Sequence, residues 1–460
     1  MTNRKEKWRV EQQRSRINKI AERADAVSIF NILTGPELFE VVESHLPAHR
    51  ERQFPPTVTL AMFINQVLDE DGSLQKAVNQ WVVQMAAEGL ARGSTNTGAY
   101  CRARQRLDLP LIKTLCETTG RLLHEAAEPE WCWRGRSVKL VDGTGLSMPD
   151  TAANQSRYPQ PSSQAAGVGF PHMRMVGVTC LATGGLLSAG LGRHAGKGQG
   201  EMGLLRALDN VFEAGDVVLA DALYCSYFLV AEMRAKGVDI ICEQHGSRHT
   251  DFRRGQSLGV RDHRVEWKKP ARPDWMTPEQ YAAIPSELSL REVEVDGRVL
   301  VTTLVEPSEV HKKELNQLYK QRWQVELDIR NIKTTMKMDV LRCKTPDAIE
   351  KEIWVHLLAY NVIRLLMAQA ASNAGLVPRE ISFKHTVQLW TQWQSRCFGN
   401  PGGADVSILF ILIAQRTVGK RPGRREPRAC KRRPKSSKWL KEPREQARQR
   451  LRDTGEMLCA

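Results

Sequence analysis

The chain has 460 residues, of which 41% are hydrophobic and 26% charged, and a formal net charge of +15. This composition is that of a folded globular protein, and it excludes a disordered or fibrous chain. The first sixteen residues lack an apolar core, and the apolar stretches at 356–368 and 406–414 are too short or too interrupted to span a bilayer, so we expect a cytosolic protein without membrane contact.

The positive charge is concentrated at the two ends. Residues 1–23 hold 8 Lys and Arg against 3 Asp and Glu, and residues 416–460 hold 16 against 5. The body between them is nearly neutral. Two basic arms on a neutral body are typical of proteins that bind nucleic acid, although a solubilising tail would have the same composition.

Residues 1–130 are predicted to form a helical DNA-binding region. Apolar residues recur at helical intervals after residue 28, and two further helices are separated at Asp71-Gly72, with Ser73 as the cap of the second. A helix capped near 94–97 then places Arg102 and Arg106 one turn apart. Paired arginines on a short helix suit DNA binding, but a plain helical bundle with solvated arginines explains the pattern nearly as well.

Residues 131–243 have the pattern of the first part of an α/β domain. A strand at 138–141 ends at Asp142 before a Gly-Thr-Gly turn, a hairpin follows at 173–191, and helices then alternate with strands at 216–220 and 238–242. This order of elements is that of a ribonuclease H-like fold, so we predict a ribonuclease H-like catalytic domain. The loop after Gly192 is not a P-loop, because its spacing is one residue short and Gly198 occupies the Ser/Thr position.

The rest of the chain is divided into three parts by composition. We predict a β-rich insertion at 244–305, the second part of the catalytic domain at 306–372, and a helical C-terminal region with a basic tail at 373–460. Cys242, His245 and His249 have ligand-like spacing but no evident fourth ligand, so no zinc site is assigned. A long helix at 346–371, apolar on one face, is expected to pack on the sheet.

The stretch 319–333 is predicted to lie within one helix that begins near 308–313 and runs past Thr335. In a regular α-helix Tyr319, Arg322, Glu326 and Lys333 fall within an arc of roughly 60°. Trp323 lies at the edge of that face, where a core position is equally possible, and Lys337 would sit above Tyr319. A carboxylate among cations and a phenol can hold a metal ion and a phosphate chain, whereas the alternative is a solvated charged face.

Three carboxylates can converge in this arrangement. Asp142 and Asp221 follow strands that are expected to be neighbours, and Glu326 comes from a helix laid across the sheet. Two-metal phosphodiester chemistry needs such a cluster, and an all-oxygen site favours Mg²⁺. Each aspartate alone is more often a turn residue or a helix cap.

These motifs together resemble a known family. The sequence DGTG at Asp142, the sequence LADALYCSY around Asp221, and the spacing of Tyr319, Arg322, Glu326 and Lys333 are similar to those of the DDE transposases of bacterial insertion sequences, in the insertion sequence family four group. Stretches such as FPPTVTLAMFINQVL and RPGRREPRACKRRPK extend the likeness over most of the chain. Ala222 departs from it, because relatives commonly carry Arg directly after the second Asp.

The resemblance implies a function and roles for these residues. Asp142, Asp221 and Glu326 would bind two catalytic ions, Mg²⁺ or Mn²⁺, while Tyr319, Arg322 and Lys333 would contact phosphates. The implied reaction is cut-and-paste transposition through a hairpin intermediate, carried out at terminal inverted repeats and on target DNA by a homodimer near the bacterial nucleoid.

Several points stay open at the level of sequence. A tryptophan of the insertion stacks on a flipped base in related enzymes, and either Trp267, Trp275 or neither has that role here. The alternatives to a transposase are a ribonuclease H-like metal nuclease without strand transfer and a catalytically inactive DNA-binding relative.

Overall fold

The protein is a mixed α/β structure built around one nine-stranded sheet. The computed structural model describes residues 54–87, 93–397, 406–419 and 441–455. The strands lie in the order β3-β2-β1-β4-β5-β9-β8-β7-β6. The basic N-terminal arm, the helix expected after residue 28 and most of the basic tail lie outside the described residues.

The first five strands form the half of the sheet that carries the site. Strand β1 (Val138–Ser147) pairs antiparallel with β2 (His172–Cys180), and β2 pairs antiparallel with β3 (Leu186–Arg193). On its other side β1 pairs parallel with β4 (Val217–Ala220), which pairs parallel with β5 (Asp239–Glu243). The order of elements along the chain is the predicted one, and β1 and β4 are neighbours as expected.

Strand β1 is longer than predicted. Its parallel pairing with β4 includes Leu140, but β1 continues to Ser147 against β2, so Asp142 lies within the strand and the predicted Gly-Thr-Gly turn is wrong. Both glycines are needed for close approach. A Cβ on Gly143 would lie 2.3 Å from the Glu201 carboxyl carbon, and one on Gly145 would lie 2.2 Å from His172 Nε2.

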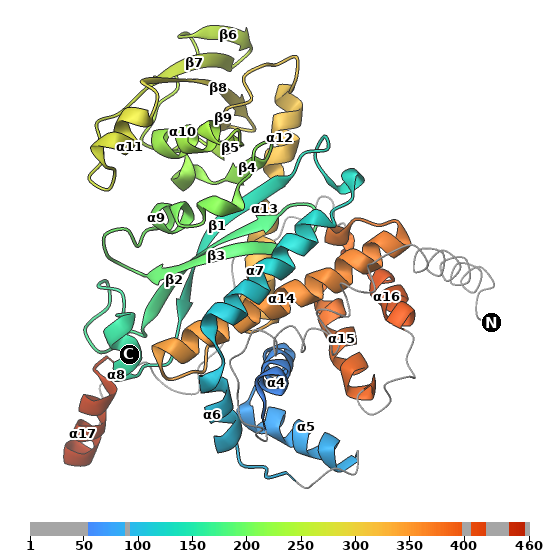
Figure 1. Cartoon of the computed structure of the whole chain (residues 1–460). Helices are drawn as coiled ribbons and strands as arrows, with labels where there is room; N and C mark the ends of the chain where they lie inside the picture. Colours follow the sequence, from blue (N-terminus) through green and yellow to red (C-terminus); the bar gives the residue numbers. More distant parts are fainter. Residues whose placement is uncertain (1–53, 88–92, 398–405, 420–440, 456–460) are drawn as a thin grey trace.

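The strands predicted as an insertion extend the same sheet. The antiparallel strands β6 (Gln256–Gly259), β7 (Asp262–Lys268), β8 (Glu287–Val295) and β9 (Arg298–Thr302) join it through the pairing of β9 with β5. They stand at the top of Figure 1. The domain boundaries at 243 and 305 stay predictions, and main-chain hydrogen bonds between β5 and β9 cross the first of them.

Helices cover both faces of the sheet. On one face, α9 (Glu201–Arg206) and α10 (Tyr227–Ala235) bury apolar residues against β1 and β2. On the other, α12 (Lys312–Lys320) and α13 (Trp323–Arg330) pack on β1 and β4. The short elements are α8 (Ala152–Arg157), α11 (Pro278–Ala283), the 3₁₀ turns η1 (Pro129–Trp131), η2 (Asp209–Val211), η3 (Ala222–Tyr224) and η5 (Pro378–Glu380), and the π-helical turn η4 (Asn331–Thr335).

The long helix α14 (Pro346–Ala374) is buried on most of its circumference, not on one face as predicted. It lies alongside α7 (Leu109–Glu125) and next to β3 (Figure 1). Asn361 forms hydrogen bonds with the backbone of Leu186 in β3 and of Cys116 in α7. By length and composition α14 could cross a membrane, but 89% of its most apolar stretch is buried inside the protein, as in the core helix of a folded domain.

The described N-terminal helices are α4 (Pro56–Leu68), α5 (Leu74–Ala87) and α6 (Gly98–Arg106). The predicted break and cap are confirmed, because Ser73 Oγ accepts a hydrogen bond of 3.2 Å from the amide of Lys76. Arg342, just before α14, donates a hydrogen bond to the carbonyl oxygen of Asp71, and Lys351 in α14 donates one to that of Gln105. These bonds hold the N-terminal helices against the start of α14.

The C-terminal region is helical as predicted, with α15 (Phe383–Cys397) and α16 (Val406–Ala414) beside α14. The tail contains a helix that was not predicted, α17 (Arg444–Thr454). Pro443, just before it, lies close to Gly167, which places the start of α17 beside the loop after α8 (Figure 1).

Candidate active site

Asp142 and Asp221 are brought together by strand register. Leu140 and Leu219 are partners in the parallel pair of β1 and β4, and each aspartate lies two residues beyond its leucine. Glu326 is the fourth residue of α13, whose preceding residue Val325 packs in the same apolar cluster as those two leucines. The fold therefore directs all three predicted carboxylates to one end of the β1–β4 pair.

Electrostatics support this convergence. The pKa of Asp142 is raised to about 6, chiefly because burial penalises its charged form. The Gly143 amide and Arg322 act against that rise, and the charges of Asp221 and Glu326 add to it. The site therefore brings carboxylates together with too little positive charge to balance them. A bound cation would reduce the repulsion between them.

The donor set suits a hard cation, because all three side chains offer carboxylate oxygens. As they stand, however, no three His, Cys, Asp or Glu side chains among the described residues lie close enough together to hold an ion. Glu326 Oε1 instead accepts a hydrogen bond of 2.8 Å from Arg322 Nη2. A rotation of the Glu326 side chain away from Arg322 is what a metal-bound state would require.

The helix over 319–333 is not continuous, so that prediction is wrong. Helix α12 ends at Lys320, and the amide of Arg322 bonds the carbonyl of Tyr319, three residues back, in a tightened turn. After α13 the chain widens into the π-helical turn η4. Both irregularities change the rotation per residue, so the regular 100° step does not describe this face.

Tyr319 and Lys333 both contact the sheet. Tyr319 is buried, its hydroxyl donates to the carbonyl of Ala220 at 3.3 Å, and burial raises its pKa. Lys333 Nζ donates to Thr144 Oγ1 at 3.1 Å and to the carbonyl of Gly145 at 2.8 Å. Tyr319 thus supports the backbone before Asp221, and Lys333 brings a half-buried cation beside β1. Their contacts with phosphate stay predictions.

The structure corrects the predicted position of Lys337 and decides between the two alternatives for Trp323. Lys337 does not sit above Tyr319, because η4 ends at Thr335 and Lys337 has a φ of 60°, which ends the helix. Its ammonium instead reaches the carbonyl of Glu70 in the N-terminal region. The side chain of Trp323 is 49% exposed, so the core alternative is wrong for this residue and it is accessible beside Arg322.

The predicted arginine pair lies on α6. Arg102 and Arg106 are both exposed, whereas Arg104 between them is buried with its guanidinium 3.6 Å from the centre of the Phe63 ring. The placement permits DNA binding by the outer pair, which stays a prediction.

The two tryptophans of the predicted insertion differ. Trp267 is buried, donates from Nε1 to Glu292 at 2.8 Å and is covered by the Arg248 guanidinium, so it belongs to the core of the β6–β9 strands. Trp275 is 43% exposed, with the Arg206 guanidinium 3.6 Å from its ring centre. Of the two, Trp275 is the one with an accessible ring.

Glu201 is a neighbour of the site that the sequence did not reveal. It begins α9, its carboxylate covers the Cα of Gly143, and its Oε2 accepts a hydrogen bond of 3.1 Å from Tyr224. Because side chains alternate along a strand, Glu201 lies across β1 from Asp142. The only available signal was a glutamate after a glycine-rich loop, which does not indicate a site by itself.

Asp328 was also missed, and it holds the α13 helix in place. The carboxylate is fully buried, and its Oδ1 accepts hydrogen bonds from Arg364 at 2.5 Å and from Arg379 at 2.7 Å. Arg379 further bonds the carbonyls of Cys180 and Leu181 at the end of β2. This network ties α13 to α14 and to the sheet, two residues after Glu326.

Comparisons with known proteins show which family the chain belongs to. The family model described as "Transposase DDE domain" matches residues 133–362. The chain is 27% identical over 419 residues to the transposase InsG for insertion sequence element IS4 of Escherichia coli K12, covering 87% of this chain and 90% of that protein. It is 33% identical over 71 residues to the putative transposase InsL for IS186A of the same organism, covering 15% and 19%.

A solved structure gives a weaker likeness. The chain superimposes on the piggyBac transposase in a synaptic complex with hairpin DNA with a TM-score of 0.44 and 10% identity, over 87% of this chain and 86% of that one. The family match covers half of the chain, includes Asp142, Asp221 and Glu326, and agrees with the full-length likeness to IS4. This protein therefore belongs to the DDE transposases, in the IS4 family of bacterial insertion sequences.

Proposed function

We propose that this transposase moves its element by a cut-and-paste reaction, in which metal-dependent hydrolysis at inverted-repeat ends is followed by strand transfer to target DNA. The observation that carries the proposal is the placement of Asp142, Asp221 and Glu326 at one end of the β1–β4 pair, where Asp142 is buried among like charges. DNA is the substrate and partner that the family supports.

Asp142, Asp221 and Glu326 would hold the divalent ions, Mg²⁺ or Mn²⁺. When bound, two such ions activate the attacking oxygen and stabilise the leaving one. The protein's part is to bring the carboxylates together and to orient them. Asp221 Oδ1 accepts the Leu223 amide at 2.8 Å, and Asp142 Oδ1 accepts the Gly143 amide at 2.8 Å, so backbone hydrogen bonds restrict both side chains.

The cations beside the carboxylates would bind the DNA backbone. Arg322 is half-buried and paired with Glu326. If Glu326 held a metal ion instead, the Arg322 guanidinium could pair with a phosphate in a bidentate manner. Lys333 lies on the same side of β1, at Thr144, two residues after Asp142. Together they would place a DNA strand across the carboxylates, with exposed Trp323 beside it.

The hairpin intermediate, the action on both element ends by a homodimer, and the location of the enzyme at the nucleoid belong to the same proposal. They rest on the likeness to IS4 transposases. A metal nuclease without strand transfer and an inactive DNA-binding relative are the competing functions. Ala222, which follows Asp221 without a basic side chain, is the position that favours the inactive alternative.

A cleavage assay tests the proposal. DNA that carries the inverted repeats flanking the gene is incubated with the full chain and Mg²⁺, and the products are resolved on denaturing gels. Hairpin ends support cut-and-paste transposition, simple nicks indicate a nuclease, and binding without cutting indicates an inactive relative.

The matched variants are Glu326→Gln and Glu279→Gln. Glu326→Gln removes one ligand charge and should abolish cleavage while leaving DNA binding intact. Glu279 lies exposed in α11, so Glu279→Gln should cleave like the wild type. Retained cleavage by Glu326→Gln would remove Glu326 from the active site.

A further inference from the structure

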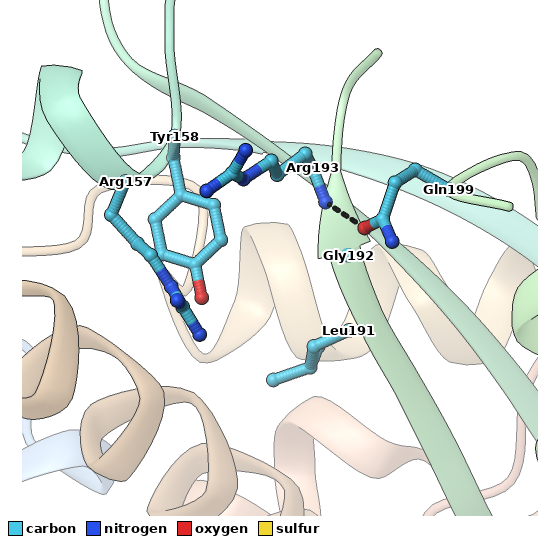
Figure 2. Close-up of a pocket in the computed structure, with 6 residues that line it drawn as sticks. All are labelled: Arg157, Tyr158, Leu191, Gly192, Arg193 and Gln199. Carbon is cyan, nitrogen blue, oxygen red and sulfur yellow. Dashed lines mark hydrogen bonds between the residues drawn. The ribbon is translucent and has the colours of Figure 1, made fainter. Parts of the chain in front are cut away.

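A pocket lies beside the last residues of β3. It has a volume of ≈ 280 Å³ and is lined by Arg157, Tyr158, Leu191, Gly192, Arg193 and Gln199 (Figure 2). Arg157 ends α8 and Arg193 ends β3, so two arginines from separate elements line one concave site, on either side of Tyr158.

The walls of this pocket are held by hydrogen bonds. The buried Tyr158 hydroxyl donates to Glu350 of α14, and its carbonyl accepts the His172 amide at 3.2 Å. Gln199 Oε1 accepts the Arg193 amide at 2.9 Å, the contact drawn in Figure 2. The shape is therefore set by the fold, and a ligand would not have to order the backbone first.

The two arginines are exposed and available for a ligand. Within the described ranges, no carboxylate forms an ion pair with Arg157 or Arg193. Arg157 has only the phenol of Tyr158 as a hydrogen-bonding neighbour, with Glu350 and Asp347 farther away. Two exposed guanidinium groups at a concave site attract an anion that can accept several hydrogen bonds.

Other basic side chains lie near the pocket. His194 follows Arg193, and its ring centre lies 5.0 Å from that of His172. The pKa of His172 is lowered first by burial and then by the charges of His194, Lys333 and Arg174. The end of β1, the start of β2 and the end of β3 thus bring Lys333, Arg193 and His194 to the same edge of the sheet.

Register relates the pocket to the active site. Thr144, which accepts a hydrogen bond from Lys333, pairs across the strands with Met175, and Met175 pairs with Leu191 of the pocket wall. Two inter-strand spacings separate Thr144 from Leu191, or about 10 Å. This separation is of the order of the distance between neighbouring phosphates, so one DNA strand can reach both positions.

We propose that Arg157 and Arg193 form a binding site for phosphate groups of the DNA backbone, on the same strand as the phosphate bound near Lys333. This inference rests on the proposed function. The site reads the backbone and not the bases, because the Tyr158 ring is only 5% exposed and cannot stack on a base. The phosphates come from element DNA, flanking donor DNA or target DNA, which share this chemistry.

The test is the salt dependence of DNA binding by the full chain. Arg157→Gln and Arg193→Gln are compared with the wild type on duplexes that carry an element end and its flank. Each lost phosphate contact should reduce the slope of log K against log salt by about 0.9, and Arg193→Lys should restore it. Arg121→Gln is the matched control, because Arg121 in α7 is already paired with Glu125 at 2.8 Å.

Shortened duplexes identify the source of the phosphates. If the difference in salt slope between wild type and variant disappears when the element side is shortened, the pocket holds element DNA. If that difference disappears when the flank is shortened, the pocket holds donor DNA. A difference seen only in target capture by preformed end complexes assigns target DNA. Each of these results supports the site.

Two results would overturn it, and they are distinguishable. In the first, the wild type binds and cuts element ends, but both glutamine variants keep the wild-type salt slope. This result overturns the phosphate site alone. A wild type that does not bind element ends overturns the proposed function, and the phosphate site with it. Thermal unfolding of the variants confirms folding, which should be unaffected because both arginines are exposed.

Discussion

Replacing Asp142 by Asn should stabilise the metal-free protein while abolishing catalysis. Burial among Asp221 and Glu326 raises the pKa of Asp142 from 3.8 to about 6. At a pH between these two values, the Asp142 carboxyl is protonated in the folded protein and ionised in the unfolded chain. The free energy of unfolding therefore has its full value at low pH and decreases as the pH rises through about 6. At pH 8 the ionised carboxylate costs about 3 kcal/mol, at 1.36 kcal/mol per pKa unit.

The Asn side chain is neutral at every pH, so the variant should unfold with a free energy about 3 kcal/mol higher than the wild type at pH 8. At pH 4.5 the difference should fall to about 1 kcal/mol. Urea unfolding in a chelator at both pH values measures this. Mg²⁺ at a hundredfold excess over its Kd should then stabilise the wild type by about 2.7 kcal/mol and the variant by less.

The control is Asp274→Asn, an exposed aspartate whose replacement should change neither stability nor its pH dependence. Equal stability of wild type and Asp142→Asn at pH 8 would show that the Asp142 carboxylate is not desolvated among like charges, and the electrostatic argument for a cation at this site would fail.

Three further variants examine the surroundings of the site. Lys333→Ala should weaken the complex with element ends and reduce its salt slope by about 0.9; an unchanged slope would mean that Lys333 touches no phosphate. Glu201→Ala should lower the single-turnover cleavage rate by up to about tenfold through loss of its contacts with Tyr224 and Gly143, and Glu201→Gln, which keeps the shape, should recover most of it. Asp328→Asn should destabilise the protein by about 3–5 kcal/mol, because it leaves the buried Arg364 and the partly buried Arg379 without their carboxylate; a loss below 1 kcal/mol would contradict that role.

Local patterns in the sequence predicted most elements, because each pattern reflects a local physical cause. The Ser73 cap, the β2–β3 hairpin and the alternation of helices and strands after residue 200 follow from side-chain hydrogen bonding, turn chemistry and apolar periodicity. The carboxylates were predicted from their places after apolar strands and within a family signature.

Errors arose where distant segments decide the local geometry. Gly143 and Gly145 looked like a turn, but they are strand residues that make room for Glu201 and His172. The helix over 319–333 looked regular, but the chain tightens before Arg322 and widens at η4.

The sequence by itself determined the family and predicted the three carboxylates, since both rest on residue types and spacing along the chain. Only the tertiary structure decided that Trp323 is exposed and Trp267 buried, that Glu201 and Asp328 support the site, and that Arg157 and Arg193 share a pocket. The physical reason is that burial, ion pairing and concavity depend on contacts between residues far apart in sequence, which no local pattern encodes.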